Sequence, residues 1–341
     1  MSRKKVILKK KKSILNIFTT IFIVFSVIGL ICWTGLFLFN RYIDKHSKSD
    51  DNKVQEDTNI SKKEILNVLF CGENQNLTDT MMYIKYNSTN GKISIMSIPR
   101  DTYVNSQYSS NALGGHKLNA IYTGKKNIDE LLRLVNDITG VTMDYYVIIS
   151  NDIVKELVNE IGGVEIDVPI NMKYDDESQD LHINLKKGVQ VLDGAKAEQF
   201  VRFRHNNNGT GYANGDIERI QAQQKFMKAF ISQFLSAKNI TKIGDIIGIV
   251  TKNTDTNMTA REALKYATDV TKIQTDNITT VTAPGASKYI TETSGRQTQQ
   301  ISYYVVDKVA TQKIINSDFT TENNTTNNNI VNSNSIDNTL E

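Results

Sequence analysis

Residues 14–39 form an uncharged run of 26 residues, too long and too apolar for an ordinary strand or surface helix. About 20 apolar residues suffice for a helix to cross the ~30 Å hydrocarbon core of a bilayer, so the run predicts one transmembrane helix rather than a buried core helix. A signal peptide would have a shorter apolar region and a small-residue cleavage site. Seven cations and no acidic residue precede the run. We therefore expect a single-pass protein of the cell membrane with a cytoplasmic N-terminus and everything beyond about residue 41 outside.

The charge balance changes once this N-terminal segment is set aside. The chain has 40 basic and 37 acidic residues, and seven of the basic ones precede the apolar run. The remaining 33 basic residues are outnumbered by the acidic ones, which excludes a generally basic nucleic-acid-binding body. The only cysteines are Cys32 and Cys71, too few for a disulfide scaffold or a Cys-rich zinc site.

Composition divides the chain into five segments. The apolar run separates a basic tail from a polar linker, and a stretch rich in Asn, Thr and Ser, typical of disorder, ends the chain. The region in between has the length of one folded domain. The expected segments are a basic cytoplasmic tail (1–13), the transmembrane helix (14–39), a linker (40–63), one extracytoplasmic domain (64–315) and a disordered tail (316–341).

Strand and helix patterns alternate along the expected domain, which indicates an α/β fold. Short apolar runs predict strands, and the pair Asn90-Gly91 marks a hairpin. Apolar residues at helical spacing predict helices, one of them stopped by Gly140. The expected strands are 65–70, 81–86, 92–98, 145–149 and 164–168, and the expected helices are 128–138, 153–161, 217–234 and 301–315. The order strand, helix, strand over 145–168 predicts a βαβ crossover within one sheet.

Arginine is rare in this chain, with nine residues against 31 lysines, so a group of arginines is informative. The guanidinium group binds phosphate oxygens in a bidentate way that lysine cannot match. Arg202 and Arg204 stand two apart, and a predicted strand there would place both on one face. Arg219 opens the long helix and Arg100 follows a predicted strand. The alternative is that these arginines form solvated ion pairs at the surface.

Carboxylates accompany the arginines. Asp79 lies in a predicted turn before a strand, and Asp101 directly follows Arg100. A hard cation such as Mg²⁺ takes one or two carboxylates together with substrate phosphates and waters. A loop carboxylate near several arginines therefore fits a metal–diphosphate site, although each aspartate taken alone fits a turn or helix cap equally well.

Several common catalytic motifs are missing from the sequence. There is no phosphate-binding loop of the form G-x-x-x-x-G-K-[ST], no G-x-G-x-x-G and no G-x-S-x-G. None of the four histidines belongs to an H-x-x-x-H pair, which argues against a catalytic zinc site.

Several short motifs follow one another along the expected domain. In order, they are Asn67–Gly72, Thr78–Met81, Ser97–Tyr103, Gly115–Tyr122, Gly162–Pro169, Val201–His205 and Asp216–Gln224. Two sequences among them, Ile-Pro-Arg-Asp-Thr at 98–102 and Val-Arg-Phe-Arg at 201–204, are specific in combination. In this order the motifs resemble the LytR–CpsA–Psr family of bacterial cell-envelope proteins. The resemblance covers roughly residues 64–238 and extends more loosely to about 315.

The resemblance implies a central mixed sheet flanked by helices, with an apolar channel for a prenyl chain. It implies a phosphotransferase of the envelope of bacteria, with Gram-positive bacteria as the expected source. The enzyme would move a glycopolymer, such as teichoic acid or capsule, from a polyisoprenyl (undecaprenyl) diphosphate carrier to peptidoglycan through a phosphodiester bond. The expected partners are this lipid-linked glycopolymer, peptidoglycan and the lipid bilayer, and no nucleic acid.

The matching motifs also imply roles for individual residues. Asp79 and Asn74 would hold Mg²⁺, with Mn²⁺ as an alternative. Asp101 would either orient Arg100 or act as a base. The residues implied to bind the diphosphate are Arg100, Arg202, Arg204, Arg219 and Lys117.

The sequence departs from the family pattern at three places. Asn74 stands where an aspartate is usual, Ala222 where a second helix arginine is usual, and residues 206–208 are asparagines where acids are common. Weaker metal binding follows from the neutral amide. Two alternatives to the transferase therefore remain open: a regulatory envelope protein that binds the lipid diphosphate with little turnover, and a polyisoprenyl-diphosphate phosphatase.

Overall fold

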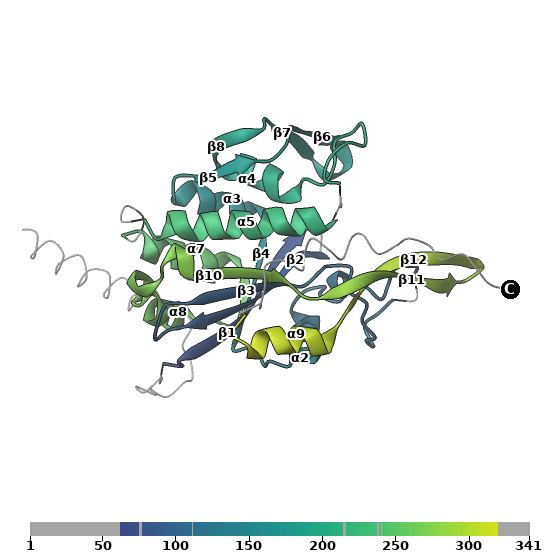
Figure 1. Cartoon of the computed structure of the whole chain (residues 1–341), viewed down its shortest axis with the longest axis horizontal. Helices are drawn as coiled ribbons and strands as arrows, with labels where there is room; N and C mark the ends of the chain where they lie inside the picture. Colours follow the sequence, from purple (N-terminus) through teal and green to yellow (C-terminus); the bar gives the residue numbers. More distant parts are fainter. Residues whose placement is uncertain are drawn as a thin grey trace, which may run out of the picture. The chain divides into compact units, whose positions relative to one another are not determined.

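The structure, a computed structural model, describes residues 62–74, 77–110, 112–213, 216–236, 239 and 241–319. A six-stranded sheet with the strand order β10-β3-β2-β1-β4-β9 lies at its centre (Figure 1). β1 is parallel to β4 and β3 to β10, while the other neighbours are antiparallel. The implied mixed sheet is confirmed. Its strands are β1 (Ile65–Asn74), β2 (Leu77–Asn87), β3 (Ile93–Ser97), β4 (Tyr145–Ser150), β9 (Asp255–Thr256) and β10 (Ile278–Thr282).

The hairpin between β2 and β3 forms where the sequence predicts it. The Asn87 side chain accepts hydrogen bonds from the backbone N–H groups of Thr89 and Asn90. Gly91 adopts a φ of 72°, a left-handed conformation that is unstrained only for glycine. A side chain there would also meet the backbone of Lys272.

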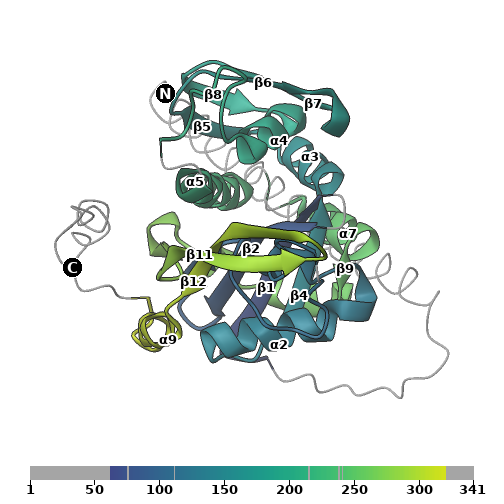
Figure 2. The same ribbon diagram turned by 90° about the vertical axis from the view of Figure 1, so that its right-hand side faces the viewer.

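Helices cover both faces of the central sheet (Figure 2). α2 (Ile128–Thr139) packs Leu131 and Val135 against Leu69 and Met81, and α9 (Lys308–Asn316) lies on the same face. α5 (Asp216–Phe234) lies on the other face, where its residues meet Met82. Successive strand residues point to opposite faces, so Met81 and Met82 belong to two separate cores. The structure also contains α7 (Ile243–Asn253), α8 (Ala260–Ala267) and the short 3₁₀ helices η1 (Leu118–Ala120), η2 (Lys125–Asn127), η3 (Glu177–Gln179), η4 (Val270–Lys272) and η5 (Thr275–Asn277).

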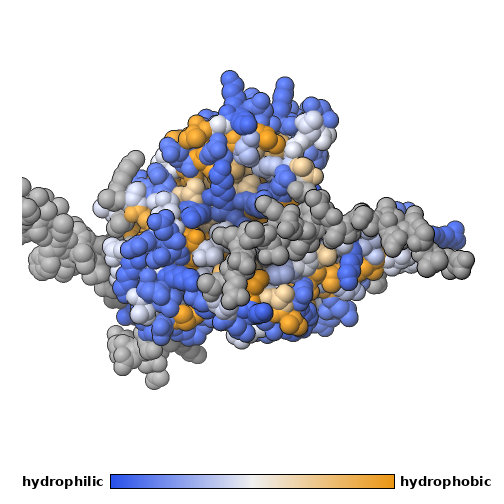
Figure 3. All heavy atoms as spheres, viewed as in Figure 1, coloured by the Kyte–Doolittle hydropathy of each residue, from blue (hydrophilic) through white to orange (hydrophobic). Residues whose placement is uncertain are grey.

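A smaller layer lies beyond α5. It contains two two-stranded sheets and two helices: β5 (Val164–Val168) with β8 (Gly188–Leu192), β6 (Met172–Asp176) with β7 (Leu181–Leu185), α3 (Asn151–Glu160) and α4 (Gly194–Arg202). Their apolar sides form one core around Phe200 and Phe203. Val189 and Val191 of β8 are exposed, and Figure 3 shows apolar surface on this layer.

The predicted βαβ crossover over residues 145–168 is wrong. β4 belongs to the central sheet, but β5 pairs with β8 in a separate two-stranded sheet. The burial of β5 explains this, because its residues alternate between buried and exposed, with Glu165 and Asp167 outside. A strand inside a sheet that helices cover on both faces would be apolar on both sides.

The predicted strand around Val201 is also wrong. α4 runs through Arg202, with the Asp193 side chain capping its first turn. Ala197, Phe200 and Phe203 are fully buried at a spacing of three, which is a helical period. This apolar stripe outweighs the local alternation of apolar and basic residues.

The predicted helix 301–315 begins later than expected. Its first residues belong to β12 (Gln297–Val306), which pairs with β11 (Gly285–Ser294) in a long hairpin (Figure 1). α9 then starts after Asp307, whose side chain caps it. The packed region extends past the expected boundary at 315, because Phe319 is buried near Tyr83.

Within the ranges that the structure describes, no helix combines the length and apolarity needed to cross a membrane. The predicted span over residues 14–39 lies outside those ranges, as do the basic tail and most of the linker and of the C-terminal stretch.

Candidate functional site

A cavity of about 230 Å³ lies between one end of the central sheet and the smaller layer. The ends of β1 and β2 form one side, and the C-terminal end of α4 and the first turns of α5 form another. The lining residues that carry charge are Glu73, Asp79, Arg100, Arg202, Arg204 and Arg219. The four arginines that the sequence analysis grouped therefore meet at one cavity, although they come from separate segments.

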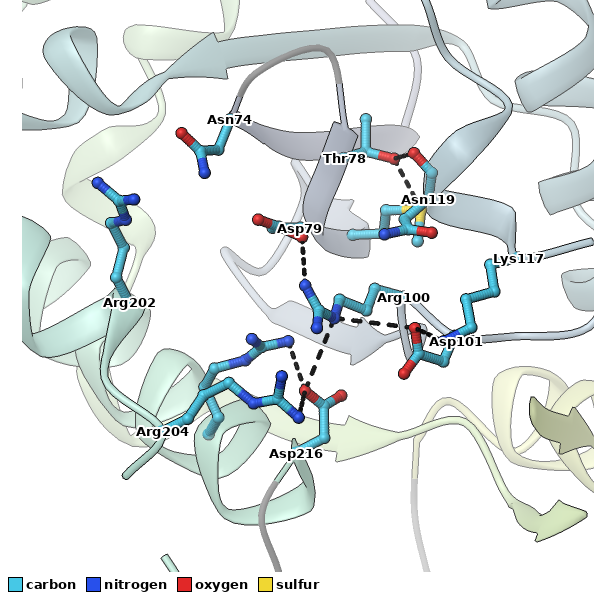
Figure 4. Close-up of polar contacts among 12 residues, drawn as sticks. Asn74, Thr78, Asp79, Arg100, Asp101, Lys117, Asn119, Arg202, Arg204 and Asp216 are labelled. Atoms are coloured by element: carbon cyan, nitrogen blue, oxygen red, sulfur yellow. Dashed lines mark hydrogen bonds and ion pairs between the residues drawn. The ribbon is translucent and has the colours of Figure 1, made fainter. Parts of the chain in front are cut away.

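Asp79 and Arg100 form a short ion pair in the cavity. Arg100 Nη1 donates to Asp79 Oδ1 over 2.6 Å (Figure 4). Asp79 lies inside β2 rather than in a turn before it. Burial opposes the charge of Arg100, but Asp79 and two further aspartates outweigh it and raise the pKa of the guanidinium. Arg100 therefore stays positively charged. Its Nε–H group is buried and donates no hydrogen bond in the described structure.

Asp216 joins three of the arginines. Its Oδ1 lies 2.5 Å from Arg219 Nη2 and 3.9 Å from both Arg100 Nε and Arg204 Nη2 (Figure 4). Asp216 is not among the site residues that were predicted from the sequence. The signal was present, because Asp216 precedes Arg219 by three positions, a spacing that pairs side chains on a helix.

Arg219 is the most deeply buried cation of the cavity, with its side chain 6% exposed. Burial lowers its pKa to about 10, and the neighbouring charges of Arg100 and Arg204 act in the same direction, against the opposing effect of Asp216. The group is still charged at neutral pH. Its Nε has no hydrogen-bond partner in the described structure. A buried cation with an unused donor next to two other cations is suited to an anion with several oxygens.

Arg202 reaches the cavity from another side than Arg204. Its guanidinium donates to Glu198 Oε1 over 2.9 Å and to Gln179 Oε1 over 3.1 Å. Figure 4 shows it well apart from Arg204. The two arginines therefore face one cavity from a helix end and from the following loop, not from one strand face as the sequence analysis expected.

Asp101 and Lys117 are paired with each other. Lys117 Nζ lies 3.1 Å from Asp101 Oδ1, and Arg100 Nε lies 3.9 Å from the same oxygen. Neither residue lines the arginine cavity. The structure thus places Lys117 beside Asp101 rather than among the four arginines with which the resemblance grouped it.

The residues implied to hold a metal ion lie where β1 ends and β2 begins. A bulge at Gly72 and Glu73 changes the register of β1 just before Asn74. Asn74 Oδ1 accepts a 3.4 Å hydrogen bond from Asn151, and Asp79 is already paired with Arg100. Among the described residues no three His, Cys, Asp or Glu side chains gather at a possible metal site. One carboxylate and one amide fit Mg²⁺ only if phosphate oxygens complete its shell.

The chain is similar to curated bacterial proteins along most of this region. It is 29% identical over 230 residues to the polyisoprenyl-teichoic acid–peptidoglycan teichoic acid transferase TagV of Bacillus subtilis, covering 65% of this chain and 57% of that protein. It is 28% identical over 254 residues to a protein of the same description, TagU of Bacillus anthracis, covering 70% and 79%. The match thus spans little more than half the length of TagV.

Solved structures agree with these similarities. The crystal structure of B. subtilis TagV superimposes with a TM-score of 0.61 at 26% identity, covering 76% of this chain and 100% of that one. Residues 34–320 match the LytR_cpsA_psr family. This match spans most of the chain and includes every residue of the arginine cavity. The chain therefore belongs to the LytR–CpsA–Psr family.

Proposed function

We propose that this protein is a glycopolymer transferase that moves a polymer from a polyisoprenyl diphosphate carrier to a hydroxyl group of peptidoglycan. The single observation that carries the proposal is the cavity lined by four arginines, of which Asp216 joins three. These arginines are Arg100, Arg202, Arg204 and Arg219. Four guanidinium groups at one cavity suit an anion with many oxygens, and a diphosphate has this property. The names of TagV and TagU support the same donor and acceptor classes.

The proposed reaction exchanges one phosphate ester bond for another. The acceptor hydroxyl oxygen forms a bond to the phosphorus that carries the polymer, and the bond from this phosphorus to the bridging oxygen breaks. Polyisoprenyl phosphate leaves with the negative charge of that oxygen. Fixed guanidinium groups stabilise this charge as it develops. The acceptor proton passes to the carboxylate of Asp101, which lies next to Arg100 but outside the arginine cavity.

A bound Mg²⁺ or Mn²⁺ ion would neutralise part of the diphosphate charge. Asp79 and Asn74 would hold it together with oxygens of the donor. Because Asp79 Oδ1 already accepts a hydrogen bond from Arg100, the protein alone offers few ligands to a metal ion. The metal and the donor should therefore bind together.

The proposal includes the cell membrane as the working place of the protein. A polyisoprenyl carrier cannot leave the bilayer, so an enzyme that uses it outside the cytoplasm gains from an anchor. The uncharged run over residues 14–39 and the cations before it support an extracytoplasmic body.

A polyprenyl diphosphate with a labelled sugar, incubated with the protein, Mg²⁺ and a soluble peptidoglycan fragment, tests the proposal. We expect label on the fragment, and loss of this transfer in Asp79→Asn. Release of label to water only would indicate the phosphatase. Tight binding without any turnover would indicate the regulatory protein. Exposed Arg261 of α8 provides the control, since Arg261→Ala should transfer like the wild type.

A further inference from the structure

Three polar side chains next to the arginine cavity share one face. Thr102 and Val104 are buried, while Tyr103 between them is exposed. Asp101 lies in the turn that precedes Thr102, and its carboxylate reaches this side through its 3.1 Å ion pair with Lys117. Tyr103 forms an antiparallel bridge with Lys117, so these two side chains lie side by side. We name the surface of Asp101, Tyr103 and Lys117 the acceptor face.

The Tyr103 ring is held in place but remains accessible. It stacks on His116 with 5.6 Å between ring centroids, and its plane is nearly perpendicular to that of Tyr303, with 5.2 Å between centroids. Tyr103 is nevertheless 38% exposed. Tyr103 N–H also donates to the backbone carbonyl of Tyr304 over 2.8 Å.

The β11–β12 hairpin supplies the support behind this ring. Tyr303 on β12 is 1% exposed and donates a hydrogen bond to Glu292 on β11. Glu292 also accepts from the backbone N–H of Gly114 over 2.7 Å, which ties the hairpin to the loop that precedes Lys117. The hairpin thus fixes the position of the acceptor face from behind.

We propose that the acceptor face binds a sugar ring of the hydroxyl-bearing acceptor, an inference that rests on the proposed transferase function. A pyranose ring presents C–H groups on one side and hydroxyl groups at its edge. The C–H groups fit the electron-rich face of a tyrosine. The hydroxyl groups can donate to Asp101 and accept from Lys117, and such bonds to charged groups are the stronger kind.

The position of the acceptor face relative to Arg100 supports this role. Attacking and leaving oxygens lie roughly in line in phosphoryl transfer. Figure 4 shows Asp101 and Lys117 on one side of Arg100, with Arg202 and Asn74 on the other. If the leaving phosphate lies among the cavity arginines, the acceptor hydroxyl must approach from the side of Asp101. Lys117 then contacts the acceptor and not the diphosphate.

A tryptophan at position 103 allows acceptor binding to be measured without catalysis. The chain has a single tryptophan, Trp33. In the full-length protein in detergent, Trp33→Phe combined with Tyr103→Trp leaves residue 103 as the sole indole. We expect its fluorescence to change saturably with a tetrasaccharide of alternating N-acetylglucosamine and N-acetylmuramic acid, and to do so without any lipid donor. No change would overturn the inference.

Kinetics separate the acceptor from the donor. Tyr103→Ala and Lys117→Met should raise the acceptor KM about three- to tenfold while the Kd for a polyprenyl diphosphate stays unchanged, and Tyr103→Phe should restore the acceptor KM. Tyr289, 72% exposed on β11, provides the control in Tyr289→Ala. An unchanged acceptor KM in an active Tyr103→Ala enzyme, or a weaker donor Kd in Lys117→Met, would overturn the inference.

The two proposals can fail separately. Saccharide binding at residue 103 by a protein without transfer activity would refute the transferase and support the binding surface. Transfer activity that does not depend on Tyr103 would support the transferase and refute the role of the acceptor face.

Discussion

At the scale of single residues, Asp216 holds the arginine cavity together in the absence of substrate. Three guanidinium groups lie within 4 Å of its Oδ1. Removing one partner of a buried ion pair leaves the other charges uncompensated. The cavity should then open or lose stability until an anion replaces the carboxylate.

Asp216→Asn should lower the free energy of unfolding by about 1–3 kcal/mol. Inorganic pyrophosphate should recover more stability in this variant than in the wild type, because it supplies the missing negative charge. Thermal unfolding with and without pyrophosphate measures both effects. Asp152→Asn, which removes an exposed partner of Lys155, is the control. Equal melting temperatures for Asp216→Asn and the control would contradict the assigned role.

The contributions of Asn74 and Asp79 to metal binding can be measured by substituting each residue. We expect Mg²⁺ to bind weakly to the free protein and well in the presence of a prenyl diphosphate, because Asn74 is neutral and Arg100 competes for Asp79. Asn74→Asp should strengthen binding and Asp79→Ala should abolish it. Titration calorimetry with and without the lipid tests this. Tight binding to the free protein would show that the metal lies elsewhere.

At the scale of elements, α4 shows what the sequence could and could not predict. The four arginines that rarity singled out in the sequence do meet at one cavity. The local structure around two of them was predicted wrongly, since Arg202 and Arg204 alternate with apolar residues as in a strand. The segment is helical because Phe200 and Phe203, at helical spacing, are both buried in the core. Periodicity over a longer window carries the stronger signal.

Close packing of α4 on α3 positions Arg202. A Cβ at Gly194 would lie 2.3 Å from the backbone oxygen of Lys155. Gly194→Ala should therefore push the two helices apart, lower the melting temperature and weaken prenyl diphosphate binding. Gly248→Ala is the matched control, because a Cβ there meets nothing within 4 Å. Inside α7 it should raise stability by about 0.5–1 kcal/mol. Similar changes in both variants would contradict this packing argument.

At the scale of the whole molecule, local strands were easier to predict than their partners. The β2–β3 hairpin followed from Asn90-Gly91, because turn chemistry is local. β5 was predicted as a strand but assigned to the wrong sheet, since pairing depends on contacts far along the chain. β12 was predicted as a helix for a related reason: only its pairing with β11 makes residues 301–306 extended.

The proposed topology places the body outside the cell. Protease added to intact protoplasts should digest the region beyond residue 62 and leave a tag fused before Met1 protected. Permeabilised cells, in which both ends are digested, are the control. Full protection of the body in intact protoplasts would refute the topology.

Binding of an unsubstituted polyprenyl diphosphate by calorimetry tests most directly whether the arginine cavity is the donor site. Each charge-assisted hydrogen bond is worth about 1.5–3 kcal/mol, or roughly ten- to 150-fold in Kd. We predict such losses for Arg204→Ala and Arg219→Gln, and wild-type affinity for Arg261→Ala. No binding by the wild type, or equal affinity in all three variants, would contradict the assignment of the donor to this cavity.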